Sequence, residues 1–233
     1  MLLSKLDKND LNSLFVNDKG AKLSYAQFGE DLILWSILET HNRLLSGFYI
    51  DVGAHDPIYC SNTALLHKFK NWTGINIDAS EDSIDTFNLI RPKDINICCP
   101  INHKEELLDY AIFNHPGINT LDPSAREAQR NAPHGHFKLL KTIQLRTQTL
   151  EKILDDHLPL GQNIDVLNVD VEGLDLKVLL SNNWSKYKPF VIMVEIHGLN
   201  LQNSLSNPIV DFLTQKGYKL VSHCFVTAFF IKI

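Results

Sequence analysis

The sequence lacks the long apolar segments of a membrane protein. No apolar run approaches the roughly 20 residues that a membrane-spanning helix needs, and the opening stretch MLLSKLDKNDLN is interrupted by charges within a few residues. That interruption excludes the apolar core of a secretory signal peptide. We therefore expect a soluble protein without a membrane span.

Basic stretches and paired cysteines are also missing. Lys and Arg number 22 against 27 Asp and Glu, a net charge of −5, which argues against a nucleic-acid partner held through phosphate contacts. The four cysteines are Cys60, Cys98, Cys99 and Cys224. They form no CxxC pair and have no zinc-ligand spacing, so we expect neither a disulfide framework nor a structural zinc site. A cytoplasmic location, where thiols stay reduced, fits this composition.

What the sequence does contain is an alternation of short apolar runs with amphipathic segments. The runs expected as strands cover residues 48–52, 74–78, 94–101, 107–113, 164–171, 190–198, 217–221 and 228–233, and the expected helices cover 24–40, 61–69, 80–90, 149–157 and 174–182. Continuous apolar runs are typical of strands buried on both faces. The alternation predicts an α/β fold with a doubly wound, mostly parallel sheet and a C-terminal antiparallel strand pair.

The expected organisation is a single domain over residues 1–233, with two additions. Residues 1–46 are expected as an N-terminal helical extension, in which Phe28, Leu32, Trp35 and Leu38 form an apolar stripe. Residues 114–138, rich in Pro, Gly, Asn and His, are expected as an irregular insertion that shapes the substrate region.

Helix start signals accompany the first two strands. Ser61 or Asn62 is the expected N-cap after the first strand, and Ser80 after the second, with Pro92 ending that helix.

The first strand ends in YIDVGAHDPIYCSNT, and Gly53 falls at its carboxyl end, where open α/β sheets bind ligands. The dinucleotide fingerprint GxGxxG is absent, because GAHDPI keeps only its first glycine. Asp78 ends the second strand, a position from which a carboxylate can accept hydrogen bonds from both ribose hydroxyls. Adenosine without a pyrophosphate points to S-adenosylmethionine. A helix-terminal charge at Asp78 and a turn-capping role for Asp51 are the alternatives.

Several motifs together resemble the FkbM-type methyltransferases. They are SYAQFGEDLIL (24–34), YIDVGAHDPIYCSNT (49–63), GINIDAS (74–80), LNVDVEGLDLKVLL (167–180), VIMVEIHG (191–198) and the closing GYKLV. The resemblance runs from Ser24 to the C-terminus in the family's order. It implies the class I, Rossmann-like methyltransferase fold and an S-adenosylmethionine-dependent transfer of methyl to a hydroxyl oxygen, often on a sugar of a bacterial surface glycan and sometimes on a secondary metabolite.

The resemblance also implies site residues. Gln27, Asp51, Gly53 and Asn62 fall in the family's cofactor pocket, and Asp78 falls on the ribose. His55 is expected to pack on the cofactor or touch the substrate, with a plain turn role as the alternative. This chain has Asp78 and Ala79 where many members have Glu followed by Pro, which shortens the reach to the ribose.

A sugar hydroxyl is a weak nucleophile, so we expect a general base or a divalent metal near the sheet's carboxyl edge. Asp170 and Glu172 flank the end of one strand, and Glu195 and His197 end the next. We predict Asp170, Glu172 and His197 as catalytic residues, with His197 or Asp170 as the base. Asp170, Glu195 and His197 could instead hold a hard metal ion. Structural alternatives are a helix-start carboxylate for Glu172 and a loop position for His197.

Other conspicuous residues have plainer interpretations. His134 and His136 lie in the Pro- and Gly-containing insertion without a nearby third ligand, so we expect them to be solvated. Trp35, Trp72 and Trp184 are expected as core or sheet-covering aromatics, and the pair Asp155 and Asp156 as a solvated helix end.

The sequence therefore predicts an S-adenosylmethionine-dependent O-methyltransferase that acts on a sugar hydroxyl of a surface glycan or its precursor. The alternatives are an O-methyltransferase of a secondary metabolite, a methyltransferase-like binding module without activity, and a nicotinamide-dependent oxidoreductase, which the missing glycines disfavour.

Overall fold

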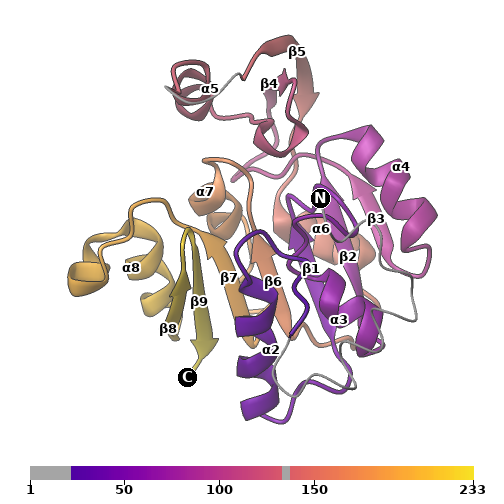
Figure 1. Ribbon diagram of the computed structural model, residues 1–233, viewed down its shortest axis with the longest axis vertical. Coiled ribbons are helices and arrows are strands. Elements are labelled where there is room, and N and C mark those ends of the chain that lie inside the picture. The colour runs from indigo at the N-terminus through magenta and orange to yellow at the C-terminus, as the bar shows by residue number, and fades with distance from the viewer. Residues whose placement is uncertain (1–21, 133–136) are drawn as a thin grey trace.

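A seven-stranded sheet forms the centre of the molecule (Figure 1). The structure, a computed structural model, describes residues 22–132 and 137–233. In the order in which they lie side by side, the strands are β3 (Ile95–Cys98), β2 (Thr73–Asp78), β1 (Phe48–Val52), β6 (Val166–Val169), β7 (Val191–Glu195), β9 (Thr227–Lys232) and β8 (Tyr218–Cys224). The first five are parallel, and β9 runs antiparallel to both of its neighbours. The expected fold, including the C-terminal antiparallel pair, is confirmed.

The central strands are buried on both faces, as their apolar runs indicate. Every residue of β1, β6 and β7 is buried. A strand covered on both faces needs apolar side chains at consecutive positions, because neither face meets water. Helices supply that cover.

Two layers of helices enclose the sheet. One apolar cluster joins α2 (Glu30–Thr40) to the sheet through Leu34, Leu38 and Met193. The cluster on the opposite face includes Ile153, Val178 and Leu213, from α6 (Leu150–His157), α7 (Asp175–Leu180) and α8 (Pro208–Gln215). The other helical segments of the main body are α3 (Ala64–Phe69), α4 (Glu81–Ile90) and the 3-10 helix η3 (Leu201–Ser206).

The helix starts differ in part from expectation. Ser80 caps α4 as predicted, accepting from the Ser83 amide. The predicted caps of α3 are wrong: Thr63 precedes the helix, while Ser61 and Asn62 are bonded to residues elsewhere in the chain. Phe28 lies before α2 rather than on its buried stripe, and 42% of it is exposed.

The insertion is more ordered than its composition indicates. It contains the 3-10 helix η2 (Pro116–Ile118) and the helix α5 (Pro123–Arg130), which Asp122 caps, so the expectation of an irregular segment is wrong. Pro at a first helical position is a start signal, because that residue needs no amide hydrogen. Of the insertion's histidines, His134 and His136 lie outside the described residues.

A second, two-stranded sheet carries this insertion. The strands β4 (Leu107–Phe113) and β5 (Leu139–Arg146) pair antiparallel, and β5 was not expected as a strand. Figure 1 shows β4, β5 and α5 as a lobe that stands beyond the carboxyl ends of the main sheet's parallel strands.

The expectations for the three tryptophans and for the acidic pair on α6 hold. Trp72 is buried, and Trp35 and Trp184 are partly buried against the two apolar clusters. Asp155 and Asp156 pair with lysines on the exposed side of α6. The four cysteines are free thiols. Of the helices described, none has the length and apolar character needed to cross a bilayer.

Candidate functional site

A cavity of about 520 Å³ opens where the parallel strands end. Gly53 and Asp78 line it from the ends of β1 and β2, and Asp170 and Glu172 from the end of β6. Tyr110 of β4 belongs to the opposite wall, which the lobe supplies. A concave site of this volume suits a small molecule.

The floor of the cavity depends on Gly53. Its φ of +81° lies in the left-handed region, and a Cβ built on it would stand 1.7 Å from the carbonyl oxygen of Asp170. No side chain fits there. The amides of Gly53 and Ala54 both donate to the carbonyl of Ile77, at 2.9 and 3.1 Å. The turn after β1 is therefore held against the ends of both neighbouring strands.

Asp78 lines the cavity, and its carboxylate also holds the backbone at the start of the next helix, which was the structural alternative. One carboxylate oxygen accepts from the amide of His55 and the other from the amide of Ser80, each at 2.8 Å. Burial raises the pKa of Asp78, although the two amide donors oppose the rise. A carboxylate offers about four acceptor positions. The two amides occupy two of these positions.

Two other predicted residues hold the site from outside the cavity lining. Asp51 is buried and accepts from the Thr63 hydroxyl at 2.8 Å and the Asn168 amide at 2.9 Å. The side-chain amide of Asn62 donates to Asn168 at 3.1 Å. These contacts tie β1 to β6 and to the start of α3.

The remaining two residues predicted for the cofactor site are Gln27 and His55, and they differ in their position relative to the cavity. Gln27 is exposed in the segment before α2 and does not line the cavity, whereas His55 does. Of the six residues predicted to hold a cofactor, the structure thus brings Gly53, His55 and Asp78 together around the cavity.

Arg91 supports the same region, and the sequence analysis missed it. Its side chain is 1% exposed and donates to the carbonyl of Pro57 and to the hydroxyls of Ser61 and Thr63. Buried guanidinium groups are rare unless their donors are satisfied. Arg91 therefore fixes the segment 57–63, which leads from the Gly53 turn into α3. In sequence it is only an arginine that follows a helix and precedes a proline.

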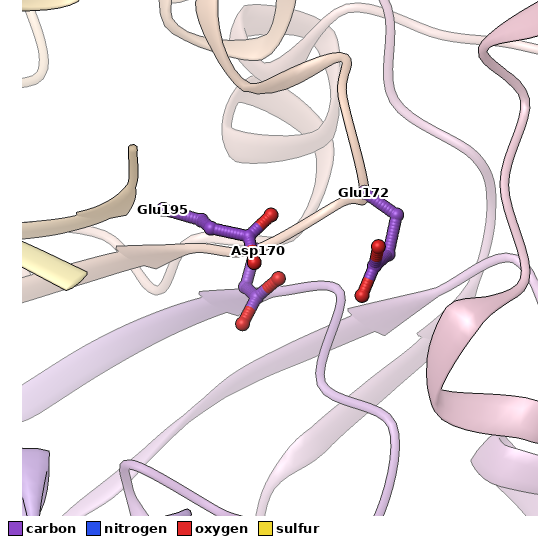
Figure 2. A group of neighbouring side chains, drawn as sticks. All are labelled: Asp170, Glu172 and Glu195. Atoms are coloured by element: carbon purple, nitrogen blue, oxygen red, sulfur yellow. The ribbon is translucent and has the colours of Figure 1, made fainter. Parts of the chain in front are cut away.

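Three carboxylates meet where β6 and β7 end (Figure 2), and two of them, Asp170 and Glu172, line the cavity. Figure 2 shows Asp170 and Glu195 side by side, with Glu172 reaching in from the loop after β6. Ligand oxygens of the three lie within 4.8 Å of one another. Glu195 is 9% exposed, and its Oε1 lies 3.0 Å from Nε2 of His197, whose side chain is 71% exposed. His197 is therefore a rim residue that reaches the cluster through Glu195.

Burial and mutual repulsion raise the pKa of each carboxyl in this cluster. Burial raises the pKa of Glu172 to about 7, and the charge of Asp175 adds to the rise. Burial, reinforced by Asp170, raises the pKa of Glu195 to about 10. The pKa of Asp170 stands well above its usual range, for burial first and then for its neighbours Asp175 and Glu172. The cluster is thus built to hold protons or a cation at neutral pH.

Side chains around Glu172 set its position. Gln129 of α5 donates to Glu172 Oε2 at 3.1 Å, so the lobe contacts the cluster directly. Asp175 accepts from the amides of Val171 and Gly173, which closes the turn that carries Glu172. Glu172 itself has a φ of +54°, in the left-handed region. Neither Gln129 nor Asp175 was predicted as part of the site.

The donor set suits a hard divalent cation. Asp170, Glu172 and Glu195 offer carboxylate oxygens from two strand ends, which are the ligands that Mg²⁺ and Mn²⁺ prefer. The predicted ligand set differs in one member, because it contained His197 in place of Glu172. Buried carboxyl groups in such a cluster also share protons.

Replacing Arg91 tests its hold on the segment 57–63. Arg91→Met should lower the free energy of unfolding by about 3 kcal/mol, because it leaves buried acceptors without their donor. Hydrogen exchange of the amides in 57–63 should speed up relative to that in β7. Arg43→Met is the matched control, since Arg43 makes an exposed ion pair with Asp165 and should cost less than about 1 kcal/mol. Equal exchange in the two variants would contradict the role of Arg91.

Comparison with known proteins places this site in a family. The model of the methyltransferase FkbM domain matches residues 51–220. No curated protein matches the chain. Among solved structures, the crystal structure of methyltransferase FkbM from Methylobacillus flagellatus KT is similar over 80% of this chain and 43% of that chain, with 14% sequence identity and a TM-score of 0.45. This chain thus spans less than half of that solved chain. Because the domain model covers most of the sequence, including every strand end that forms the cavity, the protein belongs to the FkbM methyltransferase family.

Proposed function

We propose that this protein transfers the methyl group of S-adenosylmethionine to a hydroxyl oxygen of an acceptor, and that the acceptor hydroxyl belongs to a sugar of a surface glycan or its precursor. One observation carries the proposal: a single cavity joins the Gly53 turn and Asp78 to the carboxylates Asp170 and Glu172. The first pair suits a nucleoside, and the second suits activation of a hydroxyl group.

Asp78 and its surroundings support the choice of cofactor. Its two remaining acceptor positions match a vicinal pair of ribose hydroxyls. Cys99 and Ile101, just beyond β3, give the neighbouring wall an apolar surface suited to an adenine ring. The Gly53 turn lets the backbone approach the rest of the ligand closely. S-adenosylmethionine would supply the electrophilic methyl group in this position.

The acid cluster supports proton removal from the acceptor. In the displacement, the acceptor oxygen forms its bond to the methyl carbon as the bond between that carbon and sulfur breaks, and the hydroxyl proton passes to a base. Asp170 is our candidate base, because it lines the cavity and because burial, together with its acidic neighbours, raises its pKa and so makes it a stronger proton acceptor than an ordinary carboxylate. Glu195 Oε1 lies 3.0 Å from His197 Nε2, and this pair forms a route by which the proton can leave toward the exposed rim.

The polar lining also suits a sugar. Asp56, Glu81 and Asp82 line the cavity together with the carboxylates already described, and Lys141 is its one lysine among the described residues. Carboxylates accept hydrogen bonds from several sugar hydroxyls at once. The alternative acceptor is a secondary metabolite with a free hydroxyl. A binding module without activity is disfavoured, because clustering buried carboxyl groups destabilises a fold that has no use for them.

A divalent cation is compatible with the same cluster. Asp170, Glu172 and Glu195 would hold it, and a bound cation would supply Lewis acidity that lowers the pKa of a coordinated hydroxyl. Asp170 would then be a ligand of the cation and not the base.

Asp78 is tested by cofactor binding. Asp78→Ala should weaken S-adenosylmethionine binding by roughly 1.5–3 kcal/mol, which is about 10- to 150-fold, because hydrogen bonds to a charged acceptor are lost. Asp78→Asn keeps one acceptor oxygen and should lose less. Isothermal titration calorimetry with S-adenosylmethionine, S-adenosylhomocysteine and NAD measures the effect. Unchanged affinity in Asp78→Ala would remove Asp78 from the site, and binding of NAD in preference to the adenosyl ligands would overturn the proposed function.

Asp170 is tested by turnover. Asp170→Asn keeps the shape of the side chain but cannot accept a proton, so kcat should fall by about 10²- to 10⁴-fold while the dissociation constant of S-adenosylmethionine stays within about threefold. Methyl transfer to a panel of glycosides gives the rate. His197→Ala, at the exposed rim, should reduce kcat by less. A larger loss in His197→Ala than in Asp170→Asn would make His197 the base.

Chelation separates the two ways of activating the hydroxyl. If a cation is bound, EDTA should abolish turnover, and Mg²⁺ or Mn²⁺ should restore it to the starting rate. In Glu172→Gln the same restoration should need a higher metal concentration. Turnover that EDTA leaves unchanged would exclude the metal and leave proton transfer to Asp170 as the activating step.

A further inference from the structure

Two phenylalanines stack on each other at the carboxyl edge of the sheet and keep much of their surface exposed. Phe28 lies in the segment before α2, and Phe225 lies in the turn between β8 and β9. Their ring centroids are 4.2 Å apart, with planes inclined by 39°. The exposed fractions are 42% for Phe28 and 70% for Phe225. The pair thus offers aromatic surface to a ligand instead of filling the core.

The β8–β9 turn, which carries Phe225, lies at the same edge of the sheet as the carboxylates of Asp170 and Glu195. In the pairing of β7 with β9, Glu195 lies opposite Thr227, two residues after Phe225. The amide of Ile196 donates to the carbonyl of Val226 at 2.6 Å. The turn is therefore bonded to the segment that carries Glu195 and His197.

Phe28 is fixed to the same edge from the other side. Its amide donates to Glu30 Oε2 at 2.7 Å, and its carbonyl accepts from the thiol of Cys224 at 3.4 Å. Glu30 is buried, so this contact anchors the backbone of Phe28 to the first turn of α2. Both rings therefore stand on backbone that is held in place.

The backbone of Phe225 is in a conformation that a bulky residue rarely adopts. Its φ is +54°, in the left-handed region, where glycine and asparagine are favoured. A glycine would close this turn with less strain. A phenylalanine that is both strained and exposed is better explained by what its ring contacts than by stability.

We propose that Phe28 and Phe225 form a platform on which a sugar ring of the acceptor stacks, with its hydroxyl edge directed to the carboxylates at the ends of β6 and β7. This inference rests on the proposed function and adds a binding surface to it. A pyranose ring has an apolar face of C–H groups and a polar edge of hydroxyls. Those two surfaces match an exposed aromatic pair next to acidic side chains.

The test uses the full chain saturated with S-adenosylhomocysteine and a set of methyl glycosides of glucose, galactose, mannose and rhamnose. Saturation-transfer difference NMR measures their binding. At least one glycoside should receive saturation through its ring C–H protons. Phe225→Gly should weaken its binding by about 5- to 10-fold, whereas Phe225→Trp, which keeps an aromatic face, should bind at least as well as the unmodified protein.

Stability and a matched control separate binding from folding. Because glycine relieves the left-handed strain, the melting temperature of Phe225→Gly should not fall by more than about 2 °C. Phe69→Ala removes a partly exposed aromatic side chain at the C-terminal end of α3 and should leave glycoside binding unchanged.

Each contrary result identifies what has failed. If S-adenosylhomocysteine binds but no glycoside does, or if Phe225→Gly binds glycosides as well as the unmodified protein, the platform is overturned and the proposed methyl transfer stands. If S-adenosylhomocysteine does not bind at all, the proposed function itself is overturned.

Discussion

The contact between Gly53 and the backbone of Asp170 is the constraint on which the site depends. The two residues end neighbouring parallel strands, β1 and β6, and only the absence of a side chain at Gly53 lets the Asp170 carbonyl approach. That contact places the turn after β1 directly beside the carboxylates after β6. A single cavity can then hold a cofactor against one strand end and an acceptor against the next, which is the geometry that methyl transfer requires.

Around this contact, buried polar groups hold the strand ends together, whereas apolar packing does so elsewhere in the fold. Asp51, Thr63 and Asn168 link β1, α3 and β6 behind the cavity. Arg91 then extends the network to the segment 57–63. Such groups are strongly directional, so they hold the turn in one position more closely than interchangeable apolar contacts would. Each of these polar groups must keep its hydrogen-bond partner, because a buried polar group without one destabilises the fold.

Much of the fold and part of the site could be predicted from the sequence. Buried parallel strands leave long apolar runs, and ligand sites in such sheets lie at the strand ends, so Gly53, Asp78, Asp170 and Glu195 were identifiable from position alone. The α3 cap was predicted wrongly, because Ser61 and Asn62 carry good capping side chains that long-range partners take instead. Local signals cannot reveal such competition.

What could not be predicted depends on contacts between distant segments. Gln129 reaches Glu172 from a lobe whose helix is strongly polar, and its role exists only because the lobe folds over the strand ends. Phe225 resembles any turn residue until its φ and its contact with Phe28 are known. In both residues the sequence shows the chemical group but not its neighbour, which only the folded chain supplies.

The charge balance of the cluster gives the proposed reaction a direction. Two like charges about 5 Å apart repel by about 3 kcal/mol at an effective dielectric constant near 20, so Asp170, Glu172 and Glu195, whose ligand oxygens lie within 4.8 Å of one another, favour protonation in the empty site. A sulfonium bound nearby would lower the pKa of Asp170 and leave it ready to accept a proton. Methyl transfer removes that positive charge, and the pKa of Asp170 then rises again. The carboxyl group therefore holds the acceptor's proton more firmly after the transfer than before it, which opposes the reverse reaction at the step where the proton moves.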